Sequence, residues 1–235
     1  DDMKHLALLF CSIRPEQLSE EVCDYREEEY YKSLLQFQRI IPNSFDIIVC
    51  ENTVNSLDAY KNKDLSSLLS KTNLIMVGKE NNVGSQNKGM GELIQLKVAL
   101  DSIDTTKYQN ISYVTARRFY TCPYVFERTE TMTKNALLSN PDFVFFDGRV
   151  LESYKQNCFN DMFFSMRSDI MKQYADYSIN KMQDNIANSV GSEYNLYNFV
   201  SENNLDYEWL EWLGIVRNAW DIDGNKNNLN NYHIC

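Results

Sequence analysis

The sequence contains little histidine and no closely paired cysteines. Its only two histidines, His5 and His233, lie near opposite ends of the chain. A Ser/His/Asp hydrolase or a histidine-rich zinc site would have to use one of these terminal residues, so the sequence argues against both. The six cysteines are widely spaced and form no Cys-x-x-Cys pair. This spacing favours free thiols in a reducing compartment, and we therefore expect a cytoplasmic protein.

Long apolar runs and positive charge are also scarce. No run approaches the roughly 18 apolar residues of a membrane-spanning helix, and no secretory signal is visible, so we expect no integral membrane segment. The 23 Lys and Arg residues face 33 Asp and Glu residues, which gives a formal net charge of -10. Nonspecific binding to nucleic acid or to an anionic membrane depends on basic patches, so the composition argues against both. Any phosphate site must therefore be a local cluster of cations.

Apolar runs that alternate with helical patterns predict an α/β fold. Continuous apolar runs are typical of strands covered on both faces of a parallel sheet. They occupy residues 6–11, 45–50, 74–77, 111–115 and 143–146. Helical patterns occupy residues 16–41, part of 51–69, 93–103, 160–182 and 192–204. We predict a single domain over residues 1–235, with a mostly parallel sheet flanked by helices and a loose tail at 221–235.

The two late helical patterns carry specific expectations. In the first, Met162, Phe163 and Met166 begin an inward-facing stripe at helical spacing. In the second, Ser192 is expected to cap the helix, with Glu193 in its first turn, where a carboxylate interacts favourably with the helix dipole.

A glycine-rich loop between an apolar run and a helix marks the most informative stretch. Gly84, Gly89 and Gly91 precede a helical stripe of leucines. Glycines let the backbone approach a ligand, and the helix start favours an anion such as a diphosphate. Two nucleotide motifs are excluded, because Lys88 is not followed by Ser or Thr and because Ile94 stands where a dinucleotide fingerprint needs glycine. The alternative is an ordinary strand-to-helix turn.

In a parallel sheet, ligands bind beyond the carboxyl ends of the strands. The residues expected at that edge are Ser12 to Arg14, Glu51, the glycine loop, Arg117, Arg118 and Asp147. The two adjacent arginines would neutralise a diphosphate there. The alternatives are that these arginines are a surface pair bonded to Glu127 or Glu130, and that Asp147, which precedes Gly148, only forms a turn.

Together these residues resemble a known family. The chain resembles small glycosyltransferases of the GT-A fold, of the kind that bacteria and giant viruses encode for surface glycans. The resemblance rests on the order and spacing of Ser12-Ile13-Arg14, Asn87-Lys88-Gly89 with Gly91-Glu92-Leu93, Arg117-Arg118-Phe119, Phe146-Asp147-Gly148-Arg149, the segment 161–167, and Ser192-Glu193-Tyr194.

The resemblance implies that two parts of the chain bind different substrates. Residues at about 5–120 would bind a nucleotide-sugar donor, and residues at about 121–220 a glycan or glycoconjugate acceptor. Ser12 and Arg14 would lie near the base, and Asn87 and Lys88 near the ribose or phosphates. Asp161 or Glu193, with some preference for Glu193, would take the proton of the acceptor hydroxyl. The transferred sugar would be a hexose or deoxyhexose, used in polysaccharide biosynthesis.

One departure from the family concerns metal. Metal-dependent members carry Asp-x-Asp at the end of the fourth strand, where the carboxylates hold Mn or Mg against the diphosphate. This chain has Thr115-Ala116-Arg117-Arg118 there. Arginine offsets the same phosphate charge, so we expect no protein metal ligands, while Mn or Mg as a cofactor stays open. The literal Asp221-Ile222-Asp223 precedes Gly224 and is predicted to be a turn.

Two other functions compete with sugar transfer as explanations of the sequence. Nucleotidyl transfer, which makes a sugar nucleotide, requires a glycine-rich loop directly after the first strand, and CSIRPEQ contains no glycine. A non-catalytic sugar-binding or interaction module of GT-A-like fold would explain the missing Asp-x-Asp motif and is the main alternative.

Overall fold

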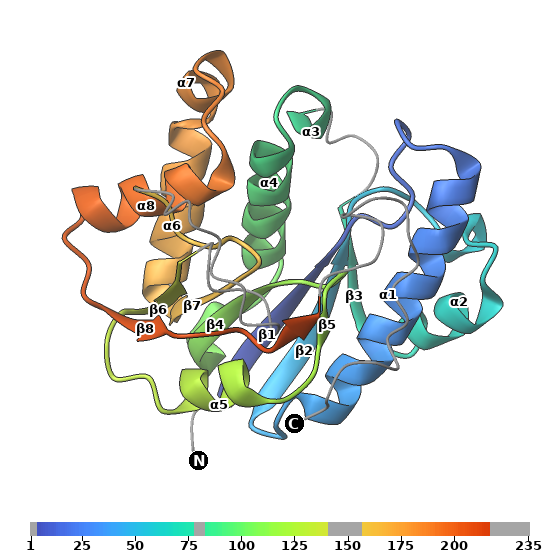
Figure 1. The fold of residues 1–235 in the computed structure, drawn as a ribbon, viewed down its shortest axis with the longest axis horizontal. Coiled ribbons are helices and arrows are strands. Elements are labelled where there is room, and N and C mark those ends of the chain that lie inside the picture. The colour runs from blue at the N-terminus through green and yellow to red at the C-terminus, as the bar shows by residue number, and fades with distance from the viewer. Residues whose placement is uncertain (1–3, 78–82, 141–156, 217–235) are drawn as a thin grey trace.

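A seven-stranded sheet organises the chain, with its strands in the order β3-β2-β1-β4-β7-β6-β8 (Figure 1). The computed structural model describes residues 4–77, 83–140 and 157–216. The strands of this sheet are β1 (Lys4–Cys11), β2 (Phe45–Glu51), β3 (Asn73–Met76), β4 (Tyr108–Thr115), β6 (Ala136–Ser139), β7 (Phe163–Arg167) and β8 (Tyr207–Leu210). A second sheet pairs β5 (Phe119–Tyr120) with β9 (Ile215–Val216).

The directions of the strands determine which strand ends meet at the same edge of the sheet. Strands β3, β2, β1 and β4 are parallel, and Leu8 of β1 pairs with Ile48 on one side and Tyr113 on the other. Strand β7 runs antiparallel to both β4 and β6, whereas β8 is parallel to β6. The amino end of β7 therefore lies at the same edge of the sheet as the carboxyl ends of β1 and β4.

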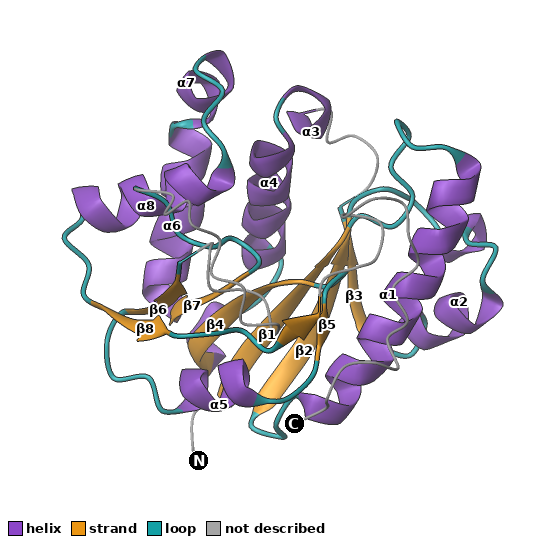
Figure 2. Ribbon diagram, viewed as in Figure 1, coloured by secondary structure: helices purple, strands orange, loops and turns teal. Residues whose placement is uncertain are grey.

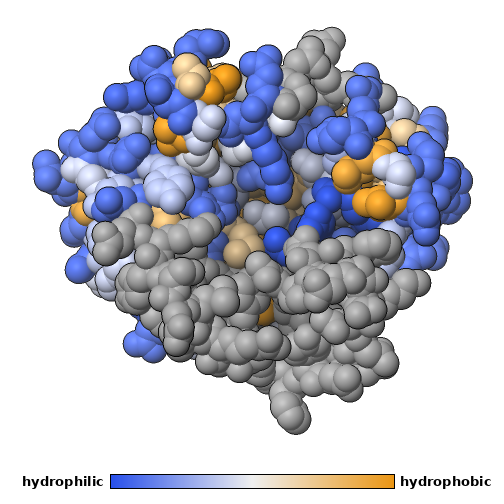
Figure 3. Space-filling view, turned by 45° about the horizontal axis from the view of Figure 1, so that its top comes forward, coloured by the Kyte–Doolittle hydropathy of each residue, from blue (hydrophilic) through white to orange (hydrophobic). Residues whose placement is uncertain are grey.

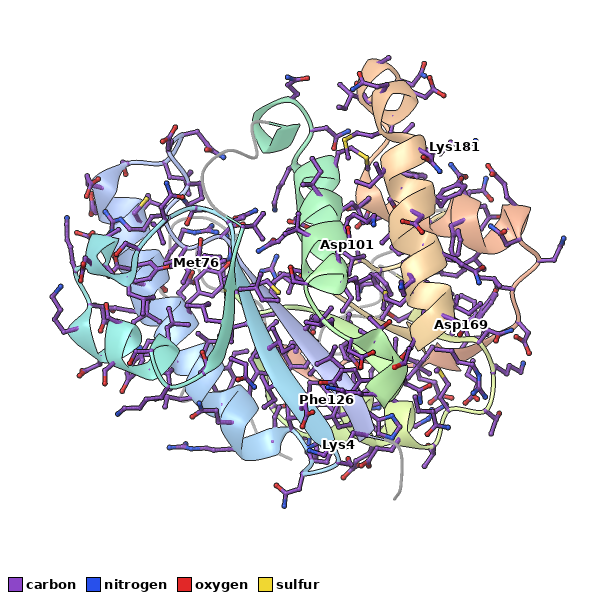
Figure 4. The ribbon with its side chains drawn as sticks, turned by 180° about the vertical axis from the view of Figure 1, so that it is seen from behind. Lys4, Met76, Asp101, Phe126, Asp169 and Lys181 are labelled. Atoms are coloured by element: carbon purple, nitrogen blue, oxygen red, sulfur yellow. The ribbon has the colours of Figure 1, made fainter. Side chains whose placement is uncertain are left out.

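Helices cover both faces of the sheet (Figure 2). They are α1 (Glu20–Ile40), α2 (Lys63–Leu69), α3 (Val83–Gln86), α4 (Lys88–Asp101), α5 (Tyr124–Glu130), α6 (Ser168–Asn180), α7 (Met182–Ala187) and α8 (Ser192–Glu202), with short 3-10 turns at Leu57–Ala59 and Thr105–Lys107. Helices α1, α2 and α5 pack on one face, and α4, α6, α7 and α8 pack on the other. Seen from behind, α4 and α6 lie side by side and run in opposite directions, with Asp101 at the end of α4 and Asp169 at the start of α6 (Figure 4).

The first helix shows how the sequence fixes an element that later supports the site. Ser19 caps α1 by accepting the N–H of Val22, and Glu20 and Glu21 occupy the first turn, where acidic residues complement the helix dipole. The helix ends before Pro42, which has no N–H to continue it. Its inner face buries apolar and aromatic side chains against β1 and β2, so α1 is held firmly beside their carboxyl ends.

The α/β fold with a mostly parallel sheet is confirmed, and four predicted strands correspond to β1, β2, β3 and β4. The predicted strand at 143–146 lies outside the described residues. The helix predicted over 160–182 is wrong at its start, because residues 163–167 form β7. Phe163 faces one core and Phe164 and Met166 face the other, so both faces of this strand are apolar and the run imitates a helical stripe.

None of the described helices combines the length and the hydrophobicity that a bilayer crossing requires. The cysteines within the described residues, Cys11, Cys23, Cys50, Cys122 and Cys158, are all buried.

Candidate functional site

A cleft opens where β1 and β4 end. It has an empty volume of about 430 Å³, part of which is open solvent. Its lining residues are Phe10, Ser12, Arg26, Tyr30, Lys88, Glu92, Gln95, Tyr113, Thr115, Arg117 and Arg118. The face shown in Figure 3 is hollowed near its centre, and hydrophilic residues lie along the upper side of the hollow. The cleft is thus at the sheet edge where α/β folds bind ligands.

The charge of this lining is opposite to that of the whole protein. Among the described residues that line the cleft, four carry cationic side chains, Arg26, Lys88, Arg117 and Arg118, and one, Glu92, carries a carboxylate. The formal net charge of the chain is -10, so the cleft is a local positive region in an acidic molecule. The structure brings Lys88, Arg117, Arg118 and Ser12 together, and their roles in binding stay predictions.

The two arginines lie in the tight turn between β4 and β5. The N–H of Ala116 donates to the carbonyl of Phe10 at 3.0 Å, and the N–H of Arg118 donates to the carbonyl of Thr115 at 3.3 Å. Helix α1 supports the turn from behind, since the Ser33 hydroxyl donates to the carbonyl of Arg117 at 3.4 Å. Backbone contacts therefore fix the position of the turn.

Ser12 is held from two sides by α1. Its N–H donates to the Tyr30 hydroxyl at 3.0 Å, and its carbonyl accepts from Nε of Arg26 at 3.1 Å. Its own hydroxyl donates to Oδ1 of Asn52 at 2.7 Å. Sequence reasoning missed Arg26 and Tyr30. Their spacing of four residues, which places them on one face of a helix, was the available signal.

The start of α4 uses two of the predicted ligands. Asn87 caps the helix by accepting the N–H of Met90 at 3.3 Å, and its amide donates to the carbonyl of Val190 at 2.9 Å. Asn87 therefore has a clear structural role, and its proposed contact with a ribose stays a prediction. The Lys88 side chain is 88% exposed and extends at the mouth of the cleft, with its Nζ 4.0 Å from Oε1 of Glu92.

Glu92 is a cleft residue that sequence reasoning did not select. The Tyr113 hydroxyl donates to its Oε2 at 3.2 Å. Burial and, to a smaller extent, the negative charge of Asp161 together raise the pKa of Glu92 to about 7, while Lys88 opposes the shift. A carboxyl group with a pKa near neutrality changes charge within the working range of an enzyme.

Gln95 ties α4 to the sheet one turn further along. Its amide nitrogen donates to the carbonyl of Cys11 at 3.2 Å and to the carbonyl of Cys50 at 2.8 Å. These are the ends of β1 and β2, so the helix cannot shift along the sheet without breaking both bonds. Lys88, Glu92 and Gln95 therefore lie in one row on the cleft side of a helix that is fixed to the sheet.

The two predicted acids lie beside the start of α4 rather than in the cleft lining. Ser192 donates a hydrogen bond to Oδ2 of Asp161. Ser192 is not the cap that the sequence suggested, because Gly191 occupies that position and Ser192 is the first helical residue of α8. Glu193 lies in the first turn, as predicted, and its carbonyl accepts the N–H of Phe159 at 3.2 Å. Asp161 is close enough to Glu92 to raise its pKa.

The first turns of α4 and α8 touch at Gly89. A Cβ atom at this position would lie 2.7 Å from the backbone nitrogen of Ser192 and 2.8 Å from its hydroxyl. We expect Gly89→Ser to destabilise the fold by about 1–3 kcal/mol, because a backbone atom cannot move aside as a flexible side chain can. Urea unfolding measures this change. Gly191→Ser is the matched control, since nothing lies within 4 Å of its Cβ position and serine is a preferred cap. Equal stability of both variants would contradict the close contact.

Two predicted binding residues, Arg14 and Glu51, are not among the described residues that line the cleft. The Arg14 guanidinium forms ion pairs with Glu20, Asp24 and Glu27. Glu51 is fully buried and accepts the N–H of Thr53 at 2.6 Å, and burial raises its pKa to about 7. Asp147 lies outside the described residues. The roles of all three in binding stay predictions.

Among the described residues, no group of three or more His, Cys, Asp or Glu side chains is arranged to hold a metal ion. Asp221, Asp223 and His233 lie outside the described residues.

Comparisons with known proteins address the fold. No protein-family model and no curated protein matches the sequence. One solved structure is described as a nucleotide-diphospho-sugar transferase from Desulfovibrio desulfuricans. The match covers 93% of this chain and 84% of the transferase chain, with a TM-score of 0.55 and 14% sequence identity. Mouse xyloside xylosyltransferase 1, in its apo form, matches 88% of this chain and 84% of its own, with a TM-score of 0.49 and 9% identity. The chain is thus similar in architecture to the first of these proteins, and its mostly parallel sheet flanked by helices is a GT-A-like fold.

Proposed function

We propose that this chain is a glycosyltransferase that moves a sugar from a nucleotide-sugar donor to a hydroxyl group of a glycan acceptor. The observation that carries the proposal is the cationic cleft at the carboxyl ends of β1 and β4. Four basic side chains gather there in a protein of net charge -10. A diphosphate is the part of a nucleotide sugar that such a cluster recognises, through charge-assisted hydrogen bonds.

In the proposed transfer, the two arginines stabilise the leaving group. When the bond between the sugar and the diphosphate breaks, negative charge develops on the leaving phosphate. Hydrogen bonds hold the backbone of Arg117 and Arg118 in the turn, so both side chains start from a fixed position at the cleft, and we propose that their guanidinium groups stabilise that charge. A planar guanidinium matches phosphate oxygens in a bidentate manner, which lysine does not. We propose that this pair replaces a protein-bound metal.

A carboxylate must take the proton of the acceptor. As the acceptor oxygen bonds to the anomeric carbon, its proton passes to the carboxylate and the nucleoside diphosphate leaves. Of the two predicted acids, we favour Asp161, because its charge reaches Glu92 in the cleft and Ser192 holds its carboxylate. Glu193 is the alternative base. The sugar would be a hexose or deoxyhexose, and polysaccharide biosynthesis in the cytoplasm would be its setting.

The proposal is tested by thermal unfolding with nucleotide sugars of different bases, each with Mn²⁺ and with EDTA. We expect one donor at about 100 times its Kd to raise Tm by about 5–10 °C, equally in both conditions. Stabilisation that EDTA abolishes would contradict the metal-independent mechanism. Stabilisation by free glycan, with no effect of any nucleotide sugar, would favour the sugar-binding module instead.

A further inference from the structure

Within the described part of the chain, Glu92 is the one residue with a carboxyl group that lines the cleft, and the proposed transfer does not use it. The charged and titratable groups that face it are Lys88 on its own helix, Tyr113 on β4, Arg118 after β4 and Asp161 before β7. Its side chain is only 20% exposed. A carboxylate in this position has one hydroxyl donor at Oε2, a distant ammonium group at 4.0 Å, and a second acid nearby.

An ionised Glu92 conflicts with the ligand that the cleft is proposed to bind. Lys88 and Arg118 would draw a diphosphate toward the same space that Glu92 lines. Two negative groups at short range in a poorly solvated cleft repel each other, and the repulsion is relieved when one of them takes up a proton. The diphosphate of a nucleotide sugar is a strong acid, so the proton must go to the carboxyl group.

We propose that Glu92 takes up a proton when the nucleotide sugar binds, and that the neutral carboxyl group then donates a hydrogen bond to an oxygen of the bound donor. The proton comes from the solvent. Tyr113 already donates to Oε2, so Oε1, on the side of Lys88, is the oxygen that carries it. This inference rests on the proposed function and adds a binding residue that sequence reasoning did not select.

The free protein is poised for this step. The pKa of Glu92 is raised to about 7, so near neutral pH the carboxyl group is about half protonated and a further negative charge completes the protonation. Since the bound state holds one proton more, donor affinity falls as pH rises above 7. Between pH 6 and pH 8 the expected loss in affinity approaches 10-fold for a single linked proton.

Isothermal titration calorimetry in pairs of buffers with different ionisation enthalpies measures the proton uptake directly. The probe is the intact nucleotide sugar that stabilises the protein, because a free nucleoside diphosphate has a phosphate group that itself titrates near pH 6, about the second pKa of a phosphate monoester. We expect uptake approaching one proton per bound ligand at pH 8 and little uptake at pH 6. Glu92→Gln should bind without proton uptake and with the same affinity at both pH values.

Two further variants sharpen the measurement. Tyr113→Phe removes the hydroxyl donor that stabilises the ionised carboxylate, so its proton uptake should fall at pH 8 because more Glu92 is already protonated. Asp101→Asn removes a negative charge from the far end of α4, where Asp101 is bonded to Lys97, and should leave the uptake unchanged. If Glu92→Gln fails to fold, the wild-type buffer dependence and the Tyr113→Phe shift still decide the question.

The outcomes separate this inference from the function on which it rests. Binding of no nucleotide sugar at any pH would overturn both. Binding with an enthalpy that is independent of the buffer would overturn the role of Glu92 and leave the glycosyltransferase proposal standing. Persistence of the uptake in Glu92→Gln would assign the proton to another group and would also overturn it.

Discussion

Replacing Arg117 and Arg118 together by alanine is expected to lower kcat/KM for the nucleotide sugar by about 10³-fold. Each charge-assisted hydrogen bond to the diphosphate contributes about 1.5–3 kcal/mol, and both are lost. The loss should appear in Kd and in kcat, because the charge on the phosphate grows as the sugar leaves. Steady-state kinetics and calorimetric titration with the donor measure the two parts.

The control for this experiment is Arg128→Ala. Arg128, on α5, donates hydrogen bonds to Tyr124 on the same helix and to Glu208 on β8. It does not line the cleft, so its loss should leave donor affinity unchanged. The double variant Arg117→Lys with Arg118→Lys keeps both charges and loses the bidentate geometry, so we expect an intermediate fall in kcat/KM. A folded double alanine variant with wild-type turnover would show that the arginines have no part in catalysis.

Arg14→Ala is expected to destabilise the fold by about 3–5 kcal/mol, because it leaves a buried charge without its partner. The partner is Glu27, whose side chain is 2% exposed and which also accepts the N–H of Asn62 at 2.6 Å. Arg14 itself is 10% exposed, so water cannot replace it. Thermal unfolding should show a fall in Tm of about 10 °C.

Two variants place this result in context. Lys61→Ala removes an exposed member of the same ion cluster, which pairs with Glu20 and Asp24, and should change stability much less. Glu27→Gln in the Arg14→Ala background should restore part of the stability, since the unpaired charge is then absent. If Arg14→Ala instead leaves stability intact and weakens only nucleotide binding, the role near the base that the sequence suggested is the right one.

The parallel half of the fold is predictable because its strands are buried on both faces. Continuous apolar runs such as residues 6–11 have no other common explanation in a protein of this size, and they match β1 and its neighbours. Strand β7 is not predictable in this way, since Phe163, Phe164 and Met166 fill two different cores and their spacing also fits a helix. Strands β6 and β8 have four residues each, too few for a clear pattern.

The cleft is predictable only in part, for a related reason. Lys88 and the two arginines follow or precede elements whose ends meet at one edge of a parallel sheet, so topology alone brings them together. Arg26 and Glu92 are single charged residues on helices, and most such residues face solvent. Arg14 follows the first strand but turns toward acids that lie one and two turns into α1. The direction of the Arg14 side chain depends on the path of the loop between β1 and α1, and the sequence does not reveal that path.

The contact at Gly89 has a mechanical consequence. With Ser192 N only 2.7 Å from the Cβ position of Gly89, nothing separates the first turns of α4 and α8. The Asn87 amide, which donates to the carbonyl of Val190 at 2.9 Å, bonds the start of α4 to the segment that leads into α8, so a ligand that displaces the start of α4 would displace Ser192, the partner of Asp161, as well. Occupancy of the donor side would in this way adjust the acceptor side before any acceptor arrives, which favours an ordered sequence in which the nucleotide sugar enters first.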